Sequence, residues 1–256
     1  MGCRMSEQAE CPECGGTGWR TVTRGSISAV ERCPCTLAGR AARLVERANI
    51  PPLYQNASFD NFSIVSDNPV TGRILGTAIT AARSYVRNFP FRIKKPGLLL
   101  AGDSGTGKTH LAVAVLRELL ARGHEGIFFL YQNLLERIQR SYNKDSGAAD
   151  REAFQSALDC EILVLDDLGA HRISEWVEDT ITSIITHRCN HRKPLIATTN
   201  LRDPEAGDSP MSGGVAGEAA ARYYLEERIG SRARSRLSEM CQVLSTRGAE
   251  DYRRRR

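Results

Sequence analysis

The stretch that decides the fold is Gly97–Thr109, which reads GLLLAGDSGTGKT. Its first five residues are a short apolar run after Pro96, which is typical of a buried strand in a parallel sheet. The next eight match G-x-x-x-x-G-K-[ST], in which the glycines let backbone N–H groups turn inward on a phosphate. Residues 110–122 then have helical spacing of apolar side chains, and such a helix attracts an anion at its N-terminus. This order predicts a nucleoside triphosphate site and disfavours the alternative, a flexible glycine turn.

Each fixed position of this loop has a chemical role. Lys108 is expected to reach the β- and γ-phosphates, and the Thr109 hydroxyl is expected to ligate magnesium. The predicted nucleotide-binding residues are Gly102, Asp103, Ser104, Gly105, Thr106, Gly107, Lys108, Thr109 and His110.

Strands and helices are expected to alternate beyond the loop. Apolar runs predict strands at 126–131, 162–165 and 194–200, and helical spacing predicts helices at 133–142 and 151–158. This alternation indicates an α/β fold, with a parallel sheet between two layers of helices.

Two of the predicted strands end in polar side chains. Asp166 and Asp167 follow one of them, at the edge where ligands bind in parallel sheets. Asp166 is the expected magnesium partner, directly or through water, and Asp167 would polarise the attacking water. Asn200 ends the next strand and would hold that water or sense the γ-phosphate. A solvated strand end is the alternative for the acids, and asparagine commonly ends strands.

Composition limits the class of protein. The 256 residues are 41% hydrophobic, enough for one domain with an appendage. A net charge of +5 permits a nucleic-acid partner without requiring one. Apolar runs are too short for a membrane span, and no secretion signal is apparent, so we expect a cytoplasmic protein. Residues 1–6 (MGCRMS) fit the loose myristoylation template, although Met5 is an alternative start.

Four cysteines are clustered near the N-terminus. Cys11 and Cys14 form C-x2-C, and Cys33 and Cys35 form C-x-C after eighteen intervening residues. Two close pairs suit tetrahedral coordination of Zn²⁺, with a small hairpin over 19–30 between them. Disulfides or a redox C-x-x-C are the alternatives, but neither the absence of a secretion signal nor the short head favours them. The other cysteines of the body are read as small buried hydrophobes.

The chain divides at its prolines. A short basic helix is predicted at 37–49, and Pro51-Pro52 marks a boundary after it. We therefore expect a zinc-binding domain at 1–50, a linker at 51–72 and an ATPase domain at 73–253. A further helix is predicted at 70–88.

Several strings together resemble one family. The strings YQNASFDNF, GLLLAGDSGTGKTHLA, ILVLDDLGAHRISEW, PLIATTNL, IGSRARSRLSEM and the closing DYR resemble the AAA+ ATPases of the DnaC/DnaI helicase-loader and IstB transposition-helper group. The resemblance covers roughly residues 54–253 and implies an AAA+ P-loop fold without a C-terminal lid, beside a zinc-ribbon-like head.

The resemblance also assigns catalytic roles. It implies that Asp166 and Asp167 are the Walker B pair, that Asn200 is sensor 1, and that Lys108 acts with them. Arg236 would be the arginine finger that completes a neighbouring subunit's site, with Arg232 one helical turn away. An ordinary solvated basic helix over 226–236 is the alternative. The long Gly/Ser/Pro-rich segment within 202–220 departs from the pattern and would shift the finger.

The same resemblance suggests partners. Single-stranded DNA would contact Arg137, Arg140, Tyr142 and Lys144, although an amphipathic helix with a solvated face is the alternative. The Arg253–Arg256 tail would add phosphate contacts or be disordered. We expect an ATP-dependent loader of a DnaB-type replicative helicase that self-associates through its ATP site. An IstB-type transposition ATPase and a zinc-based adaptor that uses ATP as a binding switch are the alternatives.

Overall fold

A computed structural model describes residues 11–15, 17–24, 27–64, 68–142, 148–171, 174–206 and 224–255. Its centre is a five-stranded parallel sheet, which confirms the predicted α/β class. The strand order is β4 (Gly126–Leu130), β5 (Ile162–Asp166), β6 (Leu195–Thr199), β3 (Gly97–Ala101) and β7 (Cys241–Ser245). Strand β6 therefore separates β3, which precedes the glycine-rich loop, from β5, which ends in the acids.

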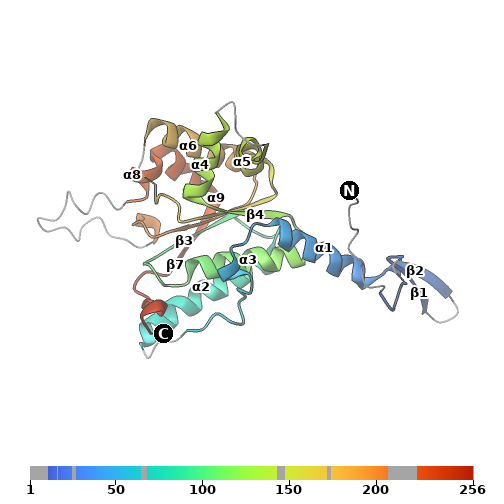
Figure 1. Cartoon of the computed structure of the whole chain (residues 1–256). Helices are drawn as coiled ribbons and strands as arrows, with labels where there is room; N and C mark the ends of the chain where they lie inside the picture. Colours follow the sequence, from blue (N-terminus) through green and yellow to red (C-terminus); the bar gives the residue numbers. More distant parts are fainter. Residues whose placement is uncertain are drawn as a thin grey trace, which may run out of the picture.

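Helices cover both faces of this sheet (Figure 1). One face packs against α1 (Pro34–Arg47), α2 (Pro69–Asn88) and α3 (Lys108–Ala121). The other face packs against α4 (Tyr131–Ser141), α5 (Ala148–Asp159), α6 (Glu175–Asn190), α8 (Glu226–Ile229) and α9 (Ser231–Met240).

Each face has its own hydrophobic core, and strand β3 shows how the sequence serves both. Leu98 and Leu100 point into the α2–α3 core, whereas Leu99 between them points into the α4–α9 core. Because successive strand residues face opposite sides, a strand that is buried on both faces needs an uninterrupted apolar run. This requirement explains the apolar runs in β3 (GLLLA) and β5 (ILVLD).

A hairpin arm projects from the body (Figure 1). Strands β1 (Trp19–Arg24) and β2 (Ile27–Arg32) pair antiparallel, with Trp19 opposite Arg32, and α1 joins them to the body. Helix α1 begins at Pro34 rather than at the predicted residue 37, because proline is favoured in the first turn, where its missing N–H costs nothing. Cys35 therefore lies in the first turn of α1.

The segment after α1 packs on the body. Ala48, Ile50, Ala57 and Phe59 are buried in the α2–α3 core, and the Ala48 carbonyl accepts a hydrogen bond of 2.8 Å from Phe128 N–H of edge strand β4. The segment includes a short 3-10 helix, η1 (Pro52–Tyr54). Much of the stretch expected as a linker thus contributes to the core.

Helices on the other face of the sheet also differ from their predicted limits. Helix α4 begins at Tyr131, directly after β4, rather than at residue 133. The basic helix expected over 226–236 is divided at Gly230 into α8 and α9. Gly230 has φ +82°, and a β-carbon there would overlap the Glu178 carboxylate, so only glycine fits at this break. The chain continues after β7 to η3 (Tyr252–Arg255), and η2 (Pro204–Ala206) follows β6.

Among the described residues, no helix combines the length and the apolar character needed to cross a membrane.

Candidate nucleotide-binding site

The carboxyl ends of three adjacent strands meet at one cavity of about 640 Å³. The loop after β3, the acids at the end of β5 and the asparagine after β6 all line it. The order β5-β6-β3 explains this meeting, because β6 carries Asn200 between the loop and the acids. Such a sheet edge is where α/β proteins bind ligands.

The glycine-rich loop has the backbone shape of a phosphate cradle. Gly105 has φ +76° and Gly107 has φ +87°, values that residues with a β-carbon rarely adopt. A β-carbon on Gly107 would also lie 2.6 Å from the Phe62 ring. Glycine is therefore required at position 107 by conformation and by space, and α3 begins at the next residue with its N-terminus at the cavity.

Lys108 lies at the floor of the cavity. Its Nζ donates a hydrogen bond of 2.7 Å to the Asp103 carbonyl, and the residue is 5% exposed. Burial lowers the pKa of this amine to about 8, although the nearby Asp167 carboxylate favours its charged form. A bound phosphate would add negative charge and keep the amine protonated.

Thr109 and Asp166 form a pair of oxygen donors suited to a hard cation. Thr109 Oγ1 donates to Asp166 Oδ1 over 2.9 Å, and Thr198 Oγ1 donates to the same oxygen over 2.6 Å. Burial raises the pKa of Asp166, the opposite of the effect of these two hydroxyls. A hydroxyl beside a carboxylate, facing a phosphate loop, fits Mg²⁺.

Asp167 lies in a strained conformation beside Asn200. Its φ is +56°, which is uncommon outside glycine and often marks functional sites. The Asp167 N–H donates to Thr198 Oγ1 over 2.9 Å, and Asn200 Nδ2 lies 3.4 Å from Asp167 Oδ1. The structure thus brings Lys108, Asp166, Asp167 and Asn200 together, as expected from the sequence.

The cavity also has an aromatic wall. Tyr54 and Phe62 line it beside His110 of α3. The rings of Phe62 and His110 meet edge to face at 5.3 Å, and His110 Nε2 lies 2.9 Å from the Ser58 carbonyl oxygen. His110 therefore ties this wall to the loop.

Sequence reasoning missed the chain after β7, which also lies against the loop. Glu250, Tyr252 and Arg253 line the cavity. Thr246 Oγ1 is 2.7 Å from Thr106 Oγ1. The only signal in the sequence was the DYR string. It lies more than 140 residues after the loop, and nothing in its spacing indicates that the two segments touch.

The arginines on α9 lie apart from this cavity. Neither Arg232 nor Arg236 is among the described residues that line it. Arg232 is exposed, and Arg236 Nη1 forms an ion pair of 2.7 Å with Glu239. Arg234, which the sequence did not single out, is buried and binds the Asp203 carboxylate through Nε and Nη2. This buried pair fixes α9 and leaves Arg232 and Arg236 toward the surface.

The four N-terminal cysteines gather at the base of the hairpin arm. Their sulfurs all lie within 4.8 Å of one another. Cys11 Sγ is 3.7 Å from Cys33 Sγ, and Cys14 Sγ is 3.4 Å from Cys35 Sγ, too long for disulfides of about 2.05 Å. Four thiolates at about 2.3 Å around one ion are separated by roughly 3.8 Å. The cluster therefore fits a four-sulfur metal site.

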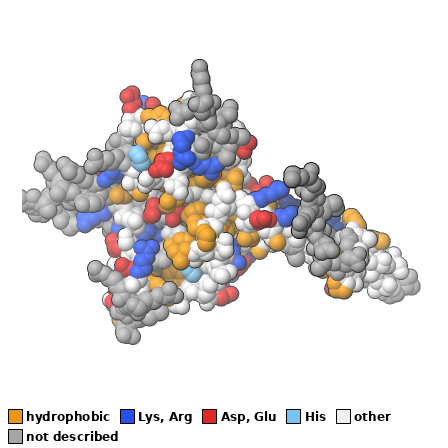
Figure 2. Space-filling model, viewed as in Figure 1, with side chains coloured by type: hydrophobic (Ala, Val, Ile, Leu, Met, Phe, Trp, Pro, Cys, Tyr) orange, Lys and Arg blue, Asp and Glu red, His pale blue; other side chains and the backbone are white. Residues whose placement is uncertain are grey.

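Two of the residues expected to contact DNA, Arg137 and Arg140, lie on α4, and Tyr142 follows its last residue. Figure 2 shows Lys and Arg side chains over this helix. Arg137 covers the Phe129 ring at 5.6 Å, Arg140 lies 3.7 Å from Glu136, and Tyr142 is 71% exposed. Lys144 is outside the described residues, as are Arg256 and residues 207–223, which contain most of the expected insertion.

Comparisons with known proteins agree with this geometry. The family model of the IstB-like ATP binding proteins matches residues 42–206. The chain is 28% identical over 163 residues to the replicative helicase loader DnaC of Escherichia coli K12, covering 64% of this chain and 63% of the loader. The chain thus spans less than two thirds of the curated relatives it matches first.

Solved structures show the same body. A crystal structure of the DnaC helicase loader superposes with a TM-score of 0.58 at 30% identity, covering 76% of this chain and 99% of that chain. A crystal structure of DnaI superposes with a TM-score of 0.55 at 21% identity, covering 80% and 97%, and supports the fold. Because the family model matches well over half of its residues, the chain belongs to the IstB-like ATP-binding protein family.

Proposed function

We propose that this protein is an ATP-dependent loader of a replicative helicase. The observation that carries the proposal is a cavity lined by the phosphate loop, Asp166, Asp167 and Asn200, on a body that superposes with the DnaC helicase loader. A protein that merely binds nucleotide needs the loop, whereas a carboxylate placed to polarise water, Asp167, serves hydrolysis.

Each residue of the site has a separate role in the proposed hydrolysis. Lys108 neutralises the β- and γ-phosphates, while Thr109 and Asp166 hold Mg²⁺, which offsets charge on the phosphates. Asp167 polarises the attacking water and Asn200 orients it. Since Arg232 and Arg236 lie outside the cavity of their own chain, the arginine finger comes from a neighbouring subunit, so that turnover requires assembly. An arginine finger accelerates such reactions about 10³-fold or more.

The remaining surfaces receive the partners. The cysteine cluster holds Zn²⁺ and stabilises the hairpin arm, where Trp19 and Val30 are 52% and 66% exposed. Figure 2 shows hydrophobic side chains on this arm. We assign the arm to the helicase, because a projecting apolar surface suits a protein partner. We assign single-stranded DNA to α4, where Arg137, Arg140 and Tyr142 offer charge and a stacking ring.

The test is a loading assay with the full chain. The replicative helicase of the same cell is incubated with the chain, ATP and a closed single-stranded DNA circle, and helicase retained on the circle is measured. We expect retention with the native chain and loss with Lys108→Ala. A Trp19→Ala, Val30→Ala double variant should lose the helicase but keep ATP hydrolysis.

The outcomes separate the alternatives. A chain that hydrolyses ATP but never binds the helicase contradicts the loader proposal and leaves the transposition ATPase, which the IstB-like match favours. A chain that binds ATP and the helicase without turnover, with or without DNA, is the adaptor that uses ATP as a switch.

A further inference from the structure

The segment that follows β7 is bound to the glycine-rich loop at three successive points. Thr246 contacts Thr106 through their hydroxyls. Arg247 Nη1 forms an ion pair of 2.9 Å with Asp103, whose other carboxylate oxygen accepts the Gly248 N–H at 3.3 Å. These contacts reach Asp103 and Thr106 of the loop and fix the path of the chain beside it.

The third point is at the tip of the loop. The Tyr252 N–H donates a hydrogen bond of 3.1 Å to the Gly105 carbonyl. A β-carbon on Gly105 would overlap the carboxylate of Asp251, so the two segments are in direct contact. Asp251 Oδ1 also accepts the Arg253 N–H at 2.9 Å, which starts the turn of η3 and sets where Arg253 leaves the backbone.

Arg253 consequently lines the nucleotide cavity from its own chain. It shares that wall with Ser104 and Gly105, whose part of the loop surrounds the α- and β-phosphates in proteins with this motif. The side chain is exposed, and within the described residues its guanidinium makes no hydrogen bond or ion pair. A cation held at a phosphate loop in this way is available to an anion.

We propose that Arg253 binds the α- and β-phosphates of the nucleotide in cis, as a clamp on the diphosphate that closes the cavity from the C-terminal side. The proposal rests on the nucleotide site of the proposed function. It gives Arg253 a role different from that of Arg236. A contact to the α- and β-phosphates affects the binding of ATP and ADP alike, whereas an arginine finger acts on the γ-phosphate, which only ATP carries.

The two roles have different kinetic signatures. Loss of a ground-state contact to the diphosphate weakens binding and raises KM, and it leaves kcat nearly unchanged. Loss of a finger that acts on the γ-phosphate in the transition state lowers kcat instead.

The experiment uses the full chain and fluorescent N-methylanthraniloyl derivatives of ATP and ADP. We expect Arg253→Ala to bind both nucleotides about tenfold more weakly, a difference of about 1.4 kcal/mol. Its KM should rise by about the same factor, with kcat within about twofold of the native value. Arg253→Lys keeps the charge and should recover most of the affinity. Arg92→Ala, an exposed arginine outside the cavity, is the matched control.

Two results would overturn the clamp. One is binding of both nucleotides by Arg253→Ala within twofold of the native chain. The other is an unchanged affinity with a large fall in kcat, which would make Arg253 a catalytic group. Failure of the native chain to bind either nucleotide would instead remove the ATP site itself, so the two failures are distinguishable. Equal thermal unfolding of the variants and the native chain shows that the fold is intact.

Discussion

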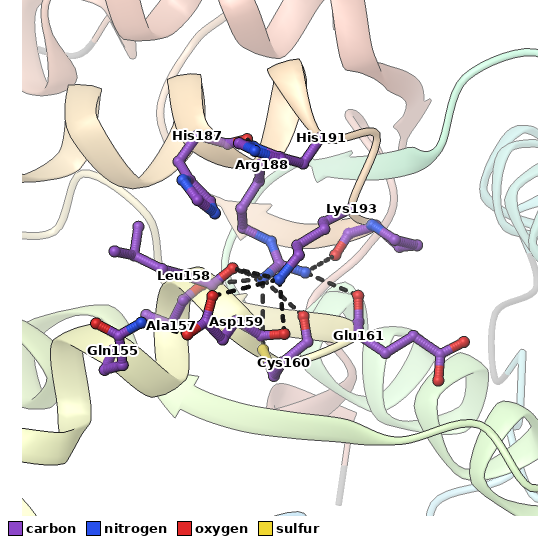
Figure 3. A network of polar contacts seen from close by, with 11 residues as sticks. Gln155, Ala157, Leu158, Asp159, Cys160, Glu161, His187, Arg188, His191 and Lys193 are labelled. Atoms are coloured by element: carbon purple, nitrogen blue, oxygen red, sulfur yellow. Dashed lines mark hydrogen bonds and ion pairs between the residues drawn. The ribbon is translucent and has the colours of Figure 1, made fainter.

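Among the described residues, Arg188 is the largest fully buried side chain, and it lies within a network of polar contacts (Figure 3). Replacing it should make the protein unfold at a markedly lower concentration of denaturant. Its guanidinium lies between the end of α5 and the starts of β5 and β6. It donates to backbone carbonyls of Ala157 (2.9 Å), Cys160 (3.1 Å), Glu161 (2.9 Å) and Pro194 (2.6 Å). One side chain thus satisfies acceptors from three segments that the sheet brings together.

The magnitude for Arg188→Met follows from the acceptors left behind. The Pro194 carbonyl keeps the Leu163 N–H at 3.1 Å, whereas Ala157, Cys160 and Glu161 lose a charged donor at 2.9, 3.1 and 2.9 Å. Each buried acceptor without its donor costs about 1–3 kcal/mol, or about 3–9 kcal/mol for three. Removal of a buried cation offsets part of this cost, because burying the charge was itself unfavourable. We expect a net loss of about 3 kcal/mol.

Urea unfolding followed by circular dichroism measures this loss. With a slope of about 3 kcal/mol per molar, the midpoint should fall by about 1 M. Arg87→Met, an exposed arginine in the last turn of α2, should change the free energy of unfolding by less than about 0.5 kcal/mol. Because Arg188 lies at the ends of the strands opposite the cavity, the folded variant should bind nucleotide normally. A midpoint equal to that of the native chain would refute the reasoning.

Three further predictions concern the sites. Asp167→Asn should still bind ATP but release phosphate on the order of 10²-fold more slowly, and native turnover would exclude Asp167 from the chemistry. Gly105→Ala should weaken nucleotide binding because the new methyl group meets the C-terminal segment. Gly123 has a similar φ but no atom within 4 Å of its β-carbon, so Gly123→Ala is the control for backbone strain. Equal effects of the two variants would contradict a role for the contact between Gly105 and the C-terminal segment. Cys14→Ser should lower bound zinc from one per chain by atomic absorption, whereas Cys189→Ser should retain it; zinc retained in both would reject the four-sulfur site.

The part of the fold that the sequence predicts is the part with local causes. A strand buried on both faces must be apolar throughout, and a phosphate loop needs glycine at positive φ, so GLLLAGDSGTGKT carries its own structure. Asp166, Asp167 and Asn200 were expected to converge because the carboxyl ends of parallel strands share one edge. The four cysteines likewise have a spacing that one ion explains.

The rest depends on contacts between distant segments, for which a single sequence has no local signal. Arg188 and Arg234 both look like surface arginines on amphipathic helices, yet one binds carbonyls from three segments and the other a buried carboxylate. The contact of Asp251 with Gly105 depends on β7 lying beside β3, and strand order is a property of the whole sheet. The break at Gly230 is a similar case, since glycine alone permits but does not require a break.

Strand β6 and the residue after it contact the two acids differently, and in the proposed function this difference bears on how hydrolysis depends on assembly. The Thr198 hydroxyl donates to the Asp166 carboxylate at 2.6 Å and accepts the Asp167 N–H at 2.9 Å. It therefore fixes the Asp166 side chain and the Asp167 backbone. The Asp167 carboxylate meets Asn200 at 3.4 Å, beyond the usual range for such a bond. The groups proposed to bind phosphate and metal are therefore held in place before nucleotide binds, whereas the Asp167 carboxylate, proposed to polarise water, is held loosely. An arginine from a neighbouring subunit would enter next to the Asp167 carboxylate, where a new charge can most easily change the position of that side chain. In the proposed function, assembly would then govern turnover without altering the affinity for nucleotide.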